Sequence, residues 1–416
     1  MGRVAELRCV LCGRSFGEGE VEYTCPHCGN DGTLDVLYDY EKARAEMSRA
    51  GLASEAPGMW RYRAILPVSR AEHVQALAVG WTPLYRSDRL AAEYGVKRLF
   101  IKDEGRNPTG SLKDRASAVG VGRAVELGRR AIACASTGNA ASSLAGFSAI
   151  TGLDAFIFVP RTAPEAKVTQ LLVYDAAVVL VDGTYEDAFN LSAEAVEEFG
   201  WYNRNCGINP YLLEGKKTCA LEIAEQLDWN APDWVFIAVG DGCCIGGLYK
   251  GFSEMVSLGL IERMPRLCGV QAEGCRPIQR AFVEEDSKVR PETAHTIADS
   301  IAVGRPRNWA KALRAVRNSG GRMVTVTDEE ILSAIGGLAR RTGVFGEPAG
   351  VAGFAGFCKM AREGMLRADD SVVVVVTGNG LKDIATARRA CREPITSEPR
   401  LEGIRCLTRA GGPGGK

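Results

Sequence analysis

Short apolar runs, each bounded by turn residues, recur along most of this chain of 416 residues. Seven of them have the length of strands, at residues 131–135, 155–159, 177–181, 234–239, 266–271, 323–326 and 371–376. Their apolar residues are continuous and do not alternate with polar ones. This pattern predicts strands that are buried on both faces, as in a parallel sheet.

Segments with the helical spacing of apolar residues separate these strands, at 142–151, 163–174, 185–199, 217–227, 246–258, 328–342 and 349–363. Regular alternation of strand and helix predicts a doubly wound α/β fold. Ligands of such folds bind at the carboxyl ends of the strands, in the loops that lead into helices. Candidate functional residues are therefore expected in those loops.

Shifts in composition divide the chain into five predicted segments. Residues 1–40 are short and rich in Cys, Gly and turns, and residues 41–101 form a connector that leads into a large domain. Residues 102–200 are expected to be a small, mobile α/β domain, and residues 201–395 to complete the large domain. The Gly/Pro-rich residues 396–416 are expected to be a flexible tail.

The charge balance narrows the classes of function. The chain has 51 Lys+Arg and 51 Asp+Glu residues, so it carries no net basic field for nucleic acid or for a membrane surface. No apolar stretch reaches the roughly 18 residues of a membrane helix, and the N-terminus lacks the apolar core of a signal peptide. These features predict a cytoplasmic protein.

Lys113 is the most informative residue. It follows an apolar strand end and a Pro/Gly turn, in the string Asn-Pro-Thr-Gly-Ser-Leu-Lys-Asp-Arg at 107–115, where a helix is expected to begin. The partial positive charge of a helix N-terminus should lower the pKa of the lysine. A neutral amine is the nucleophile that forms a Schiff base. The alternative, a solvated surface lysine, does not explain the whole string.

Two further loops follow predicted strands. Ser136-Thr137-Gly138-Asn139 offers small residues that let a ligand approach, and the Asn139 amide can donate a hydrogen bond to a phenolic oxygen. Helix capping alone would also explain this loop. Gly240-Asp241-Gly242-Cys243-Cys244 can turn backbone N–H groups toward a phosphate, with the Asp241 carboxylate pointing away. Both cysteines are expected to be buried.

Four more short sequence motifs belong to the same set as these loops: 80–84 (Gly-Trp-Thr-Pro-Leu), 209–218 (Asn-Pro-Tyr-Leu-Leu-Glu-Gly-Lys-Lys-Thr), 345–350 (Phe-Gly-Glu-Pro-Ala-Gly) and 377–383 (Thr-Gly-Asn-Gly-Leu-Lys-Asp). In this order, together with the Lys113 string, they resemble the threonine synthase family of fold-type II pyridoxal 5′-phosphate (PLP) enzymes. The resemblance runs from about residue 60 to about residue 390. It implies a tryptophan synthase β-like fold with two doubly wound parallel-sheet domains.

The resemblance also implies roles for single residues. Lys113 would hold PLP and then move protons, and Asn139 would contact the 3-hydroxyl of PLP. Thr377 would meet the pyridine nitrogen. The phosphate would lie on the loop of Gly240, Asp241, Gly242, Cys243 and Cys244, and the substrate on Ser136, Thr137 and Lys216. The implied reaction converts O-phospho-L-homoserine and water into L-threonine and phosphate, in a homodimer.

Two positions depart from the family pattern. Ala140 stands where these enzymes often have a threonine, and Leu212 and Leu213 stand where an arginine usually binds the substrate phosphate. Lys216, Lys217 or Arg161 are candidate replacements. The alternative is β-replacement or β-elimination on a serine-, threonine- or phosphoserine-type substrate, as in cysteate synthase or a dehydratase, because this chemistry needs no steps at the γ-carbon.

The N-terminal segment holds two C-x₂-C pairs, Cys9/Cys12 and Cys25/Cys28. Four thiolates on two tight turns predict a structural zinc site of the zinc-ribbon type. Free or disulfide-bonded cysteines remain the alternative, and a nucleic-acid finger is disfavoured by the charge balance. A similar ribbon occurs in some threonine synthases. A more distant hypothesis is a non-enzymatic zinc-ribbon interaction protein.

Overall fold

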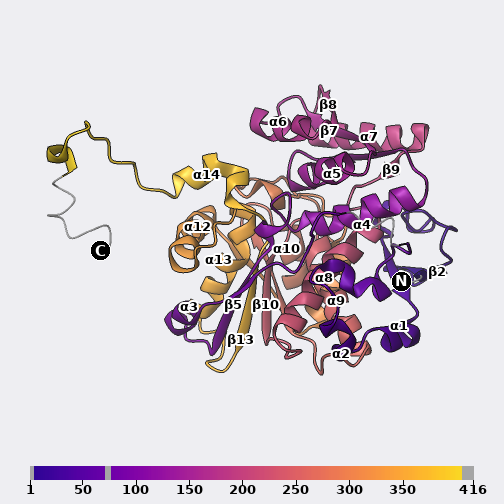
Figure 1. Cartoon of the computed structure of the whole chain (residues 1–416), viewed down its shortest axis with the longest axis horizontal. Coiled ribbons are helices and arrows are strands. Elements are labelled where there is room, and N and C mark those ends of the chain that lie inside the picture. Colours follow the sequence, from indigo (N-terminus) through magenta and orange to yellow (C-terminus); the bar gives the residue numbers. More distant parts are fainter. Residues whose placement is uncertain (1–3, 71–75, 405–416) are drawn as a thin grey trace.

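The computed structural model describes residues 4–70 and 76–404, so residues 405–416 of the predicted tail lie outside the described part. Three sheets organise these residues (Figure 1). The N-terminal sheet is antiparallel and has the strand order β2-β1-β3. Its strands are β1 (Val4–Cys9), β2 (Ser15–Phe16) and β3 (Leu34–Tyr38).

The largest sheet has the order β12-β11-β10-β13-β5-β4 and is parallel except for its edge strand β4. Its strands are β4 (Leu84–Arg86), β5 (Arg98–Asp103), β10 (Trp234–Ala238), β11 (Arg266–Ala272), β12 (Arg322–Val326) and β13 (Ser371–Val376). β10 and β13 are fully buried, as continuous apolar runs predict. The α/β fold with a parallel sheet is therefore confirmed.

A smaller parallel sheet has the order β8-β7-β6-β9. It consists of β6 (Ala131–Ala135), β7 (Asp154–Pro160), β8 (Ala177–Val181) and β9 (Tyr202–Asn203). The expectation of burial on both faces is wrong for β8. This strand lies at the edge of the sheet, where Leu180 is 44% exposed.

Helices cover both faces of the two parallel sheets, as in doubly wound folds (Figure 1). On the large sheet, α8 (Tyr211–Gln226), α9 (Cys243–Ser257) and α11 (Trp309–Asn318) pack on one face. The other face carries α3 (Asp88–Glu93), α12 (Asp328–Thr342) and α13 (Pro348–Arg362). On the small sheet, α5 (Asn139–Ala149) and α6 (Glu165–Val173) lie opposite α7 (Tyr185–Phe199). The remaining helices are α1 (Tyr40–Glu46), α2 (Arg49–Ala53), α4 (Lys113–Glu126), α10 (Pro277–Val283) and α14 (Ile384–Arg389).

The predicted helices are all present, but three begin at least three residues earlier than the apolar pattern indicated. α5, α8 and α9 begin at Asn139, Tyr211 and Cys243, where residues 142, 217 and 246 were expected. The first turns of α5 and α9 contain small or polar residues without helical periodicity, whereas α8 begins with the apolar residues Tyr211, Leu212 and Leu213. α10 and α11 were not predicted. Several cysteines outside the N-terminal segment are buried and free, among them Cys134, Cys219, Cys268 and Cys358.

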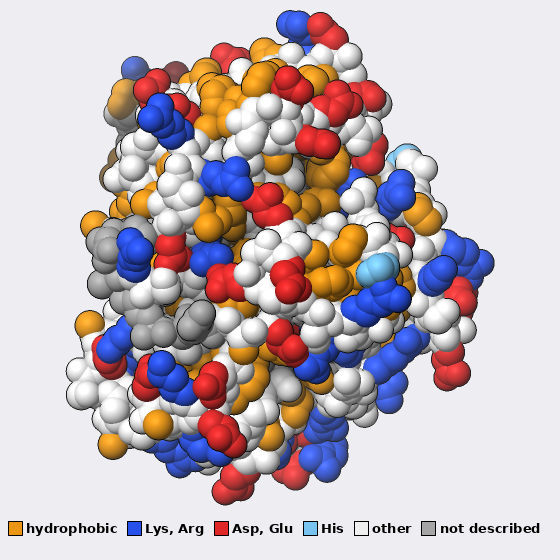
Figure 2. Space-filling view, turned by 90° about the vertical axis from the view of Figure 1, so that its right-hand side faces the viewer, with side chains coloured by type: hydrophobic (Ala, Val, Ile, Leu, Met, Phe, Trp, Pro, Cys, Tyr) orange, Lys and Arg blue, Asp and Glu red, His pale blue; other side chains and the backbone are white. Residues whose placement is uncertain are grey.

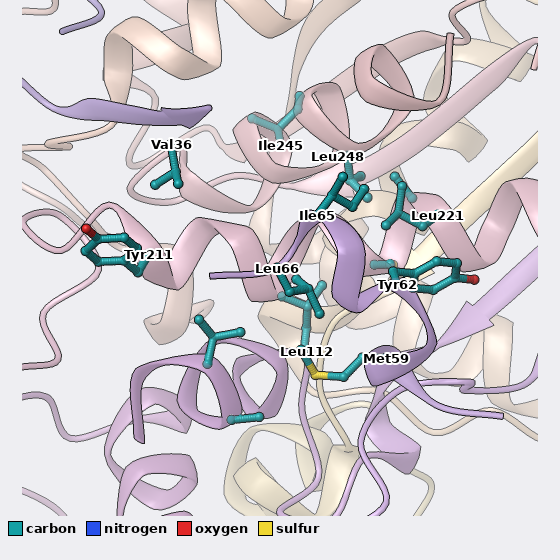
Figure 3. Close-up of a cluster of buried hydrophobic side chains, with 14 of the residues drawn as sticks. Val36, Met59, Tyr62, Ile65, Leu66, Leu112, Tyr211, Leu221, Ile245 and Leu248 are labelled. Carbon is teal, nitrogen blue, oxygen red and sulfur yellow. The ribbon is translucent and has the colours of Figure 1, made fainter. Parts of the chain in front are cut away.

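The N-terminal sheet shares the main hydrophobic core with the helices of the large sheet. Val36 from β3 lies in one buried cluster with Ile65, Leu112 and Ile245 (Figure 3). The Tyr38 hydroxyl donates to Glu214 Oε2 at 2.9 Å, and Lys311 donates to the Leu34 carbonyl. The N-terminal sheet is therefore part of the folded body and also buries charged groups.

The surface agrees with the neutral composition. On the face turned to the right in Figure 1, Lys and Arg side chains are mixed with Asp and Glu side chains (Figure 2). Within the described residues, no helix combines the length and the apolar character needed to cross a membrane.

Candidate active site

A cavity of about 460 Å³ opens where the carboxyl ends of the two parallel sheets face each other. The cavity brings together loops that are far apart in sequence. Nearly all candidate residues line it: Lys113, Ser136, Thr137, Asn139, Gly240, Asp241, Gly242, Cys243, Cys244 and Thr377. Lys216 lies behind its wall, where its ammonium donates to Cys243 Sγ at 2.8 Å.

Lys113 is the first residue of α4, as the sequence predicted. Leu112 is buried before it, and the Leu112 N–H donates to the Thr377 carbonyl at 2.9 Å. The Asp114 carboxylate accepts the Thr109 N–H at 2.6 Å. These anchors on both sides fix the backbone of Lys113 beside Thr377.

A network of buried ion pairs holds the base of this helix. Arg115 pairs with Glu104 at 2.7 Å and with Glu222 at 2.6 Å, and Lys102 pairs with Glu222 at 2.8 Å. All four side chains are completely buried. Buried charges are tolerated when they are paired and hydrogen-bonded. The network ties β5, α4 and α8 together and so determines where Lys113 enters the cavity.

Asn139 begins α5 and is held by a carboxylate that sequence reasoning did not assign a role. Its Nδ2 donates to Glu347 Oε1 at 2.6 Å. Burial raises the pKa of Glu347, while the charge of Lys113 opposes this rise. An amide nitrogen has two N–H groups, so one remains for a ligand in the cavity. Glu347 lies in the quoted string 345–350, and its position just before Pro348 was the available signal.

Gly242 allows the loop after β10 to approach its neighbours. Its φ is +98°, and an added Cβ would lie 2.6 Å from the Asn308 carbonyl oxygen. The Asp241 carboxylate accepts the Arg307 N–H and an Asn308 amide N–H, both at 2.7 Å. The negative charge of Asp241 is thus compensated by hydrogen bonds from residues 307 and 308. The first N–H groups of α9 have no partner within the helix.

Three thiols gather at this loop. Cys206 forms a hydrogen bond with Cys243, which together with burial raises the pKa of Cys206 to about 11. A hydrogen bond from Cys243 and, to a smaller extent, the charge of Lys113 lower the pKa of Cys244 to about 6. Cys243 is buried as expected, whereas Cys244 is only half-buried because it faces the cavity.

The Cys244 sulfur also acts on Lys113. It raises the pKa of the Lys113 amine, while burial works in the opposite direction. The expected lowering of this pKa is therefore wrong. That expectation considered the helix terminus alone and not the thiolate that the fold places beside the amine.

The amino-acid sequence that forms this cavity is similar to those of known proteins. Residues 75–378 match the family described as pyridoxal-phosphate dependent enzyme. The chain is 42% identical to threonine synthase of Methanocaldococcus jannaschii, over 94% of this chain and 96% of the relative. It is also 42% identical to threonine synthase of Methanosarcina acetivorans, over 96% and 97%. The chain belongs to the pyridoxal-phosphate dependent enzymes. Within that family it is a threonine synthase-like lyase.

Solved structures agree on the fold of this PLP lyase. Diaminopropionate ammonia lyase from Escherichia coli superposes with a TM-score of 0.66 at 19% identity, covering 77% of this chain and 90% of that one. Maize serine racemase superposes with a TM-score of 0.61 at 24% identity, covering 72% and 88%. The predicted fold-type II architecture is confirmed, and the hypothesis of a non-enzymatic protein is wrong.

The residues around the cavity fit the cofactor of the family. Asn139 has a spare N–H, and Gly240 and Gly242 leave no room for a Cβ beside Ile301 and Asn308. Lys113 stands at the cavity wall. The structure thus provides an amine, an amide and a helix N-terminus around one volume.

The proposed replacements for the missing arginine differ in position. Lys217 is buried in ion pairs with Glu214 and Glu254, both at 2.6 Å, and Arg161 pairs with Asp182 at the surface. Neither lines the cavity. Leu212 is buried against α4, since a Cβ at Gly120 would lie 2.6 Å from its side chain. Among the three candidates, only Lys216 contacts a residue of the cavity wall.

The N-terminal cysteines form a second candidate site. The sulfurs of Cys9, Cys12, Cys25 and Cys28 lie within 4.8 Å of one another, and those of Cys12 and Cys25 are 3.7 Å apart. Sulfurs around tetrahedral zinc are about 3.8 Å apart, given Zn–S bonds of about 2.3 Å. The predicted four-cysteine cluster is present and could hold a metal ion.

Proposed function

We propose that this chain converts O-phospho-L-homoserine and water into L-threonine and phosphate. The observation that carries the proposal is 42% identity to threonine synthases along almost the whole chain. The cavity supports it, because Lys113, Asn139 and Thr377 line one volume at the expected strand ends.

We propose the following division of work. PLP, when bound, acts as an electron sink for charge that develops on the substrate carbon next to the amine. The Lys113 amine holds the cofactor and then carries protons at Cα and Cβ of the substrate. Thr377 offers a hydroxyl to the pyridine nitrogen, and Asn139 donates to the 3-hydroxyl. Ser136 and Thr137 bind the substrate carboxylate.

The phosphate of the cofactor would lie at the N-terminus of α9. Unpaired N–H groups of a helix terminus bind anions, and the loop Gly240-Asp241-Gly242-Cys243-Cys244 leads directly into it. The Asp241 carboxylate does not compete for these groups, because the backbone N–H of Arg307 and the side chain of Asn308 already occupy it.

The reaction is tested with purified holoenzyme and O-phospho-L-homoserine, by following phosphate release and identifying the amino-acid product. We expect threonine from the native protein and none from Lys113→Ala. Lys97→Ala changes an exposed lysine and is the matched control. Formation of threonine by Lys113→Ala at the native rate would refute the role of Lys113.

A second candidate is β-elimination or β-replacement on a serine-, threonine- or phosphoserine-type substrate. It is favoured by Ala140, which lines the cavity without a hydroxyl, and by Leu212, which supplies no charge. Phosphate release from phosphoserine but not from phosphohomoserine would select this reaction.

We also propose that zinc occupies the four-cysteine cluster and stabilises a segment too small to fold alone. Metal analysis of the purified protein tests this. In keeping with the family resemblance, we propose a homodimer in the cytoplasm, whose small domain (102–200) closes over the substrate against the large domain (201–395). The cavity lining from both parallel sheets supports such a closure.

A further inference from the structure

Two cations beside the cavity are buried without a carboxylate partner. Arg204 and Lys216 are each only 1% exposed. Arg204 donates to Ser117 Oγ at 3.0 and 3.3 Å and to Cys206 Sγ at 3.1 Å, and Lys216 donates to Cys243 Sγ. Within residues 4–70 and 76–404, no ion pair includes Arg204 or Lys216, whereas buried Arg115, for example, pairs with carboxylates.

An unpaired buried charge is costly, by several kcal/mol for each ion. The Cys244 thiolate offsets part of the charge around Lys216 and Lys113, since both ammonium groups lower its pKa. Cys206, the thiol to which Arg204 donates, keeps its proton at neutral pH because its pKa is raised to about 11. Within residues 4–70 and 76–404, the guanidinium of Arg204 therefore donates to no anionic side chain.

Arg204 lines the cavity and has N–H groups left for a ligand. A guanidinium has five N–H donors, and three hydrogen bonds leave two for a ligand. Arg204 and Cys206 both line the cavity, and both Arg204 and Lys216 lower the pKa of Cys206 by their charge. Two positive charges thus act on the same part of the wall.

Arg204 belongs to the side of the small sheet and is linked to the loop proposed for the cofactor phosphate through Cys206, which forms a hydrogen bond with Cys243. It follows β9, and its N–H donates to the Ala133 carbonyl in β6 at 2.8 Å. The loop 240–244 follows β10 of the large sheet. The guanidinium is therefore placed for an anion on the substrate side of the cavity.

We propose that Arg204, supported by Lys216, binds the distal anionic group of the substrate in place of the arginine absent at position 212. The inference rests on the proposed PLP chemistry and specifies its substrate class: 2-amino acids that carry a phosphate ester or a similar anion at the far end. Neutral serine or threonine would leave the buried guanidinium unpaired. A bidentate guanidinium–phosphate contact is among the stronger hydrogen-bonded pairs in proteins.

The first test compares Arg204→Gln, Arg204→Lys and the native holoenzyme. We expect Arg204→Gln to raise KM for O-phospho-L-homoserine about 10- to 100-fold, as for loss of a charged hydrogen bond, with the visible absorbance of bound PLP unchanged. Arg204→Lys keeps the charge and should recover part of the loss. Arg161→Gln removes an exposed arginine paired with Asp182 and serves as the control. An unchanged KM, or a loss confined to PLP affinity, would overturn the proposal.

A second test needs no variant and no turnover. Inorganic phosphate added to the native holoenzyme should slow the alkylation of Cys206 by iodoacetamide, followed at that residue by mass spectrometry, while chloride at equal ionic strength should not. Absence of protection would refute the anion site even if the variants do not fold. If phosphate protects Cys206 but phosphohomoserine is not turned over, the anion site stands and the proposed reaction fails.

Discussion

Replacing Gly378 with alanine should separate Asn139 from the carboxylate that orients it. An added Cβ at this position would lie 2.2 Å from Glu347 Oε1 and 3.1 Å from Asn139 Nδ2. Gly378 cannot easily retreat, because its carbonyl accepts the Glu347 N–H at 3.1 Å and its backbone bridges to Ser111. The carboxylate is therefore the group that must move.

The size of the effect follows from these distances. Ordinary contact begins near 3.4 Å, so the oxygen must shift by about 1 Å, which breaks its 2.6 Å hydrogen bond with Asn139. Loss of a hydrogen bond to a charged group costs about 1.5–3 kcal/mol. If Asn139 loses its orientation, affinity for PLP should fall by about 10- to 100-fold. Overpacking adds a stability cost of about 1–3 kcal/mol.

The assay is a titration of the apoprotein with PLP, followed by visible absorbance, together with the thermal midpoint. Gly337→Ala is the control, since its Cβ would meet atoms no closer than 3.9 Å and the helix should gain about 0.5–1 kcal/mol. Native PLP affinity in Gly378→Ala, despite the steric overlap, would show that Glu347 does not position Asn139.

Three further predictions concern other parts of the molecule. Glu222→Gln removes a buried negative charge that pairs with Arg115 and Lys102, and should lower the free energy of unfolding by denaturant by about 3–5 kcal/mol. Glu93→Gln at the surface should lower it by less than about 1 kcal/mol, and equal effects of the two variants would refute the role of burial. Because a thiolate reacts and a thiol does not, alkylation of Cys244 in the apoprotein should stay fast as the pH falls and should slow only near its pKa of about 6. A midpoint of the rate near the ordinary pKa of cysteine would contradict this. Cys12→Ser should lower bound zinc and the thermal midpoint together, and a change in neither would refute a structural metal.

The sequence was most informative for features that depend on the type and spacing of residues close together along the chain. Continuous apolar runs predicted β6, β8 and β13 with their observed bounds. For β6 and β13 the reason is that a central parallel strand must be apolar on both faces, whereas β8 is an edge strand. Spacing alone also predicted the four-cysteine cluster. The location of the candidate active-site residues at the starts of helices was predictable, because the loops that lead from strands to helices in this fold meet at the carboxyl edge of the sheet.

Predictions failed where the decisive neighbour is distant along the chain. Asn139 and Glu347 are separated by 208 positions, and neither residue type alone indicates the contact. Arg204 follows a strand of only two residues, too short to show a pattern. The pKa of Lys113 depends on Cys244, which follows a different strand of the same sheet, β10, and is 131 positions away along the chain.

The amino-acid sequence by itself determined the alternation of strands and helices, the lysine at the start of α4 and the cysteine pairs, because each depends on periodicity or short spacing. Only the tertiary structure decided which charges are compensated. Lys217 and Arg161 form ion pairs with carboxylates in the folded chain, whereas Arg204 and Lys216 form none within the part of the chain that the structure describes. Electrostatic energy depends on distance in space and on burial, and neither can be read from position along the chain.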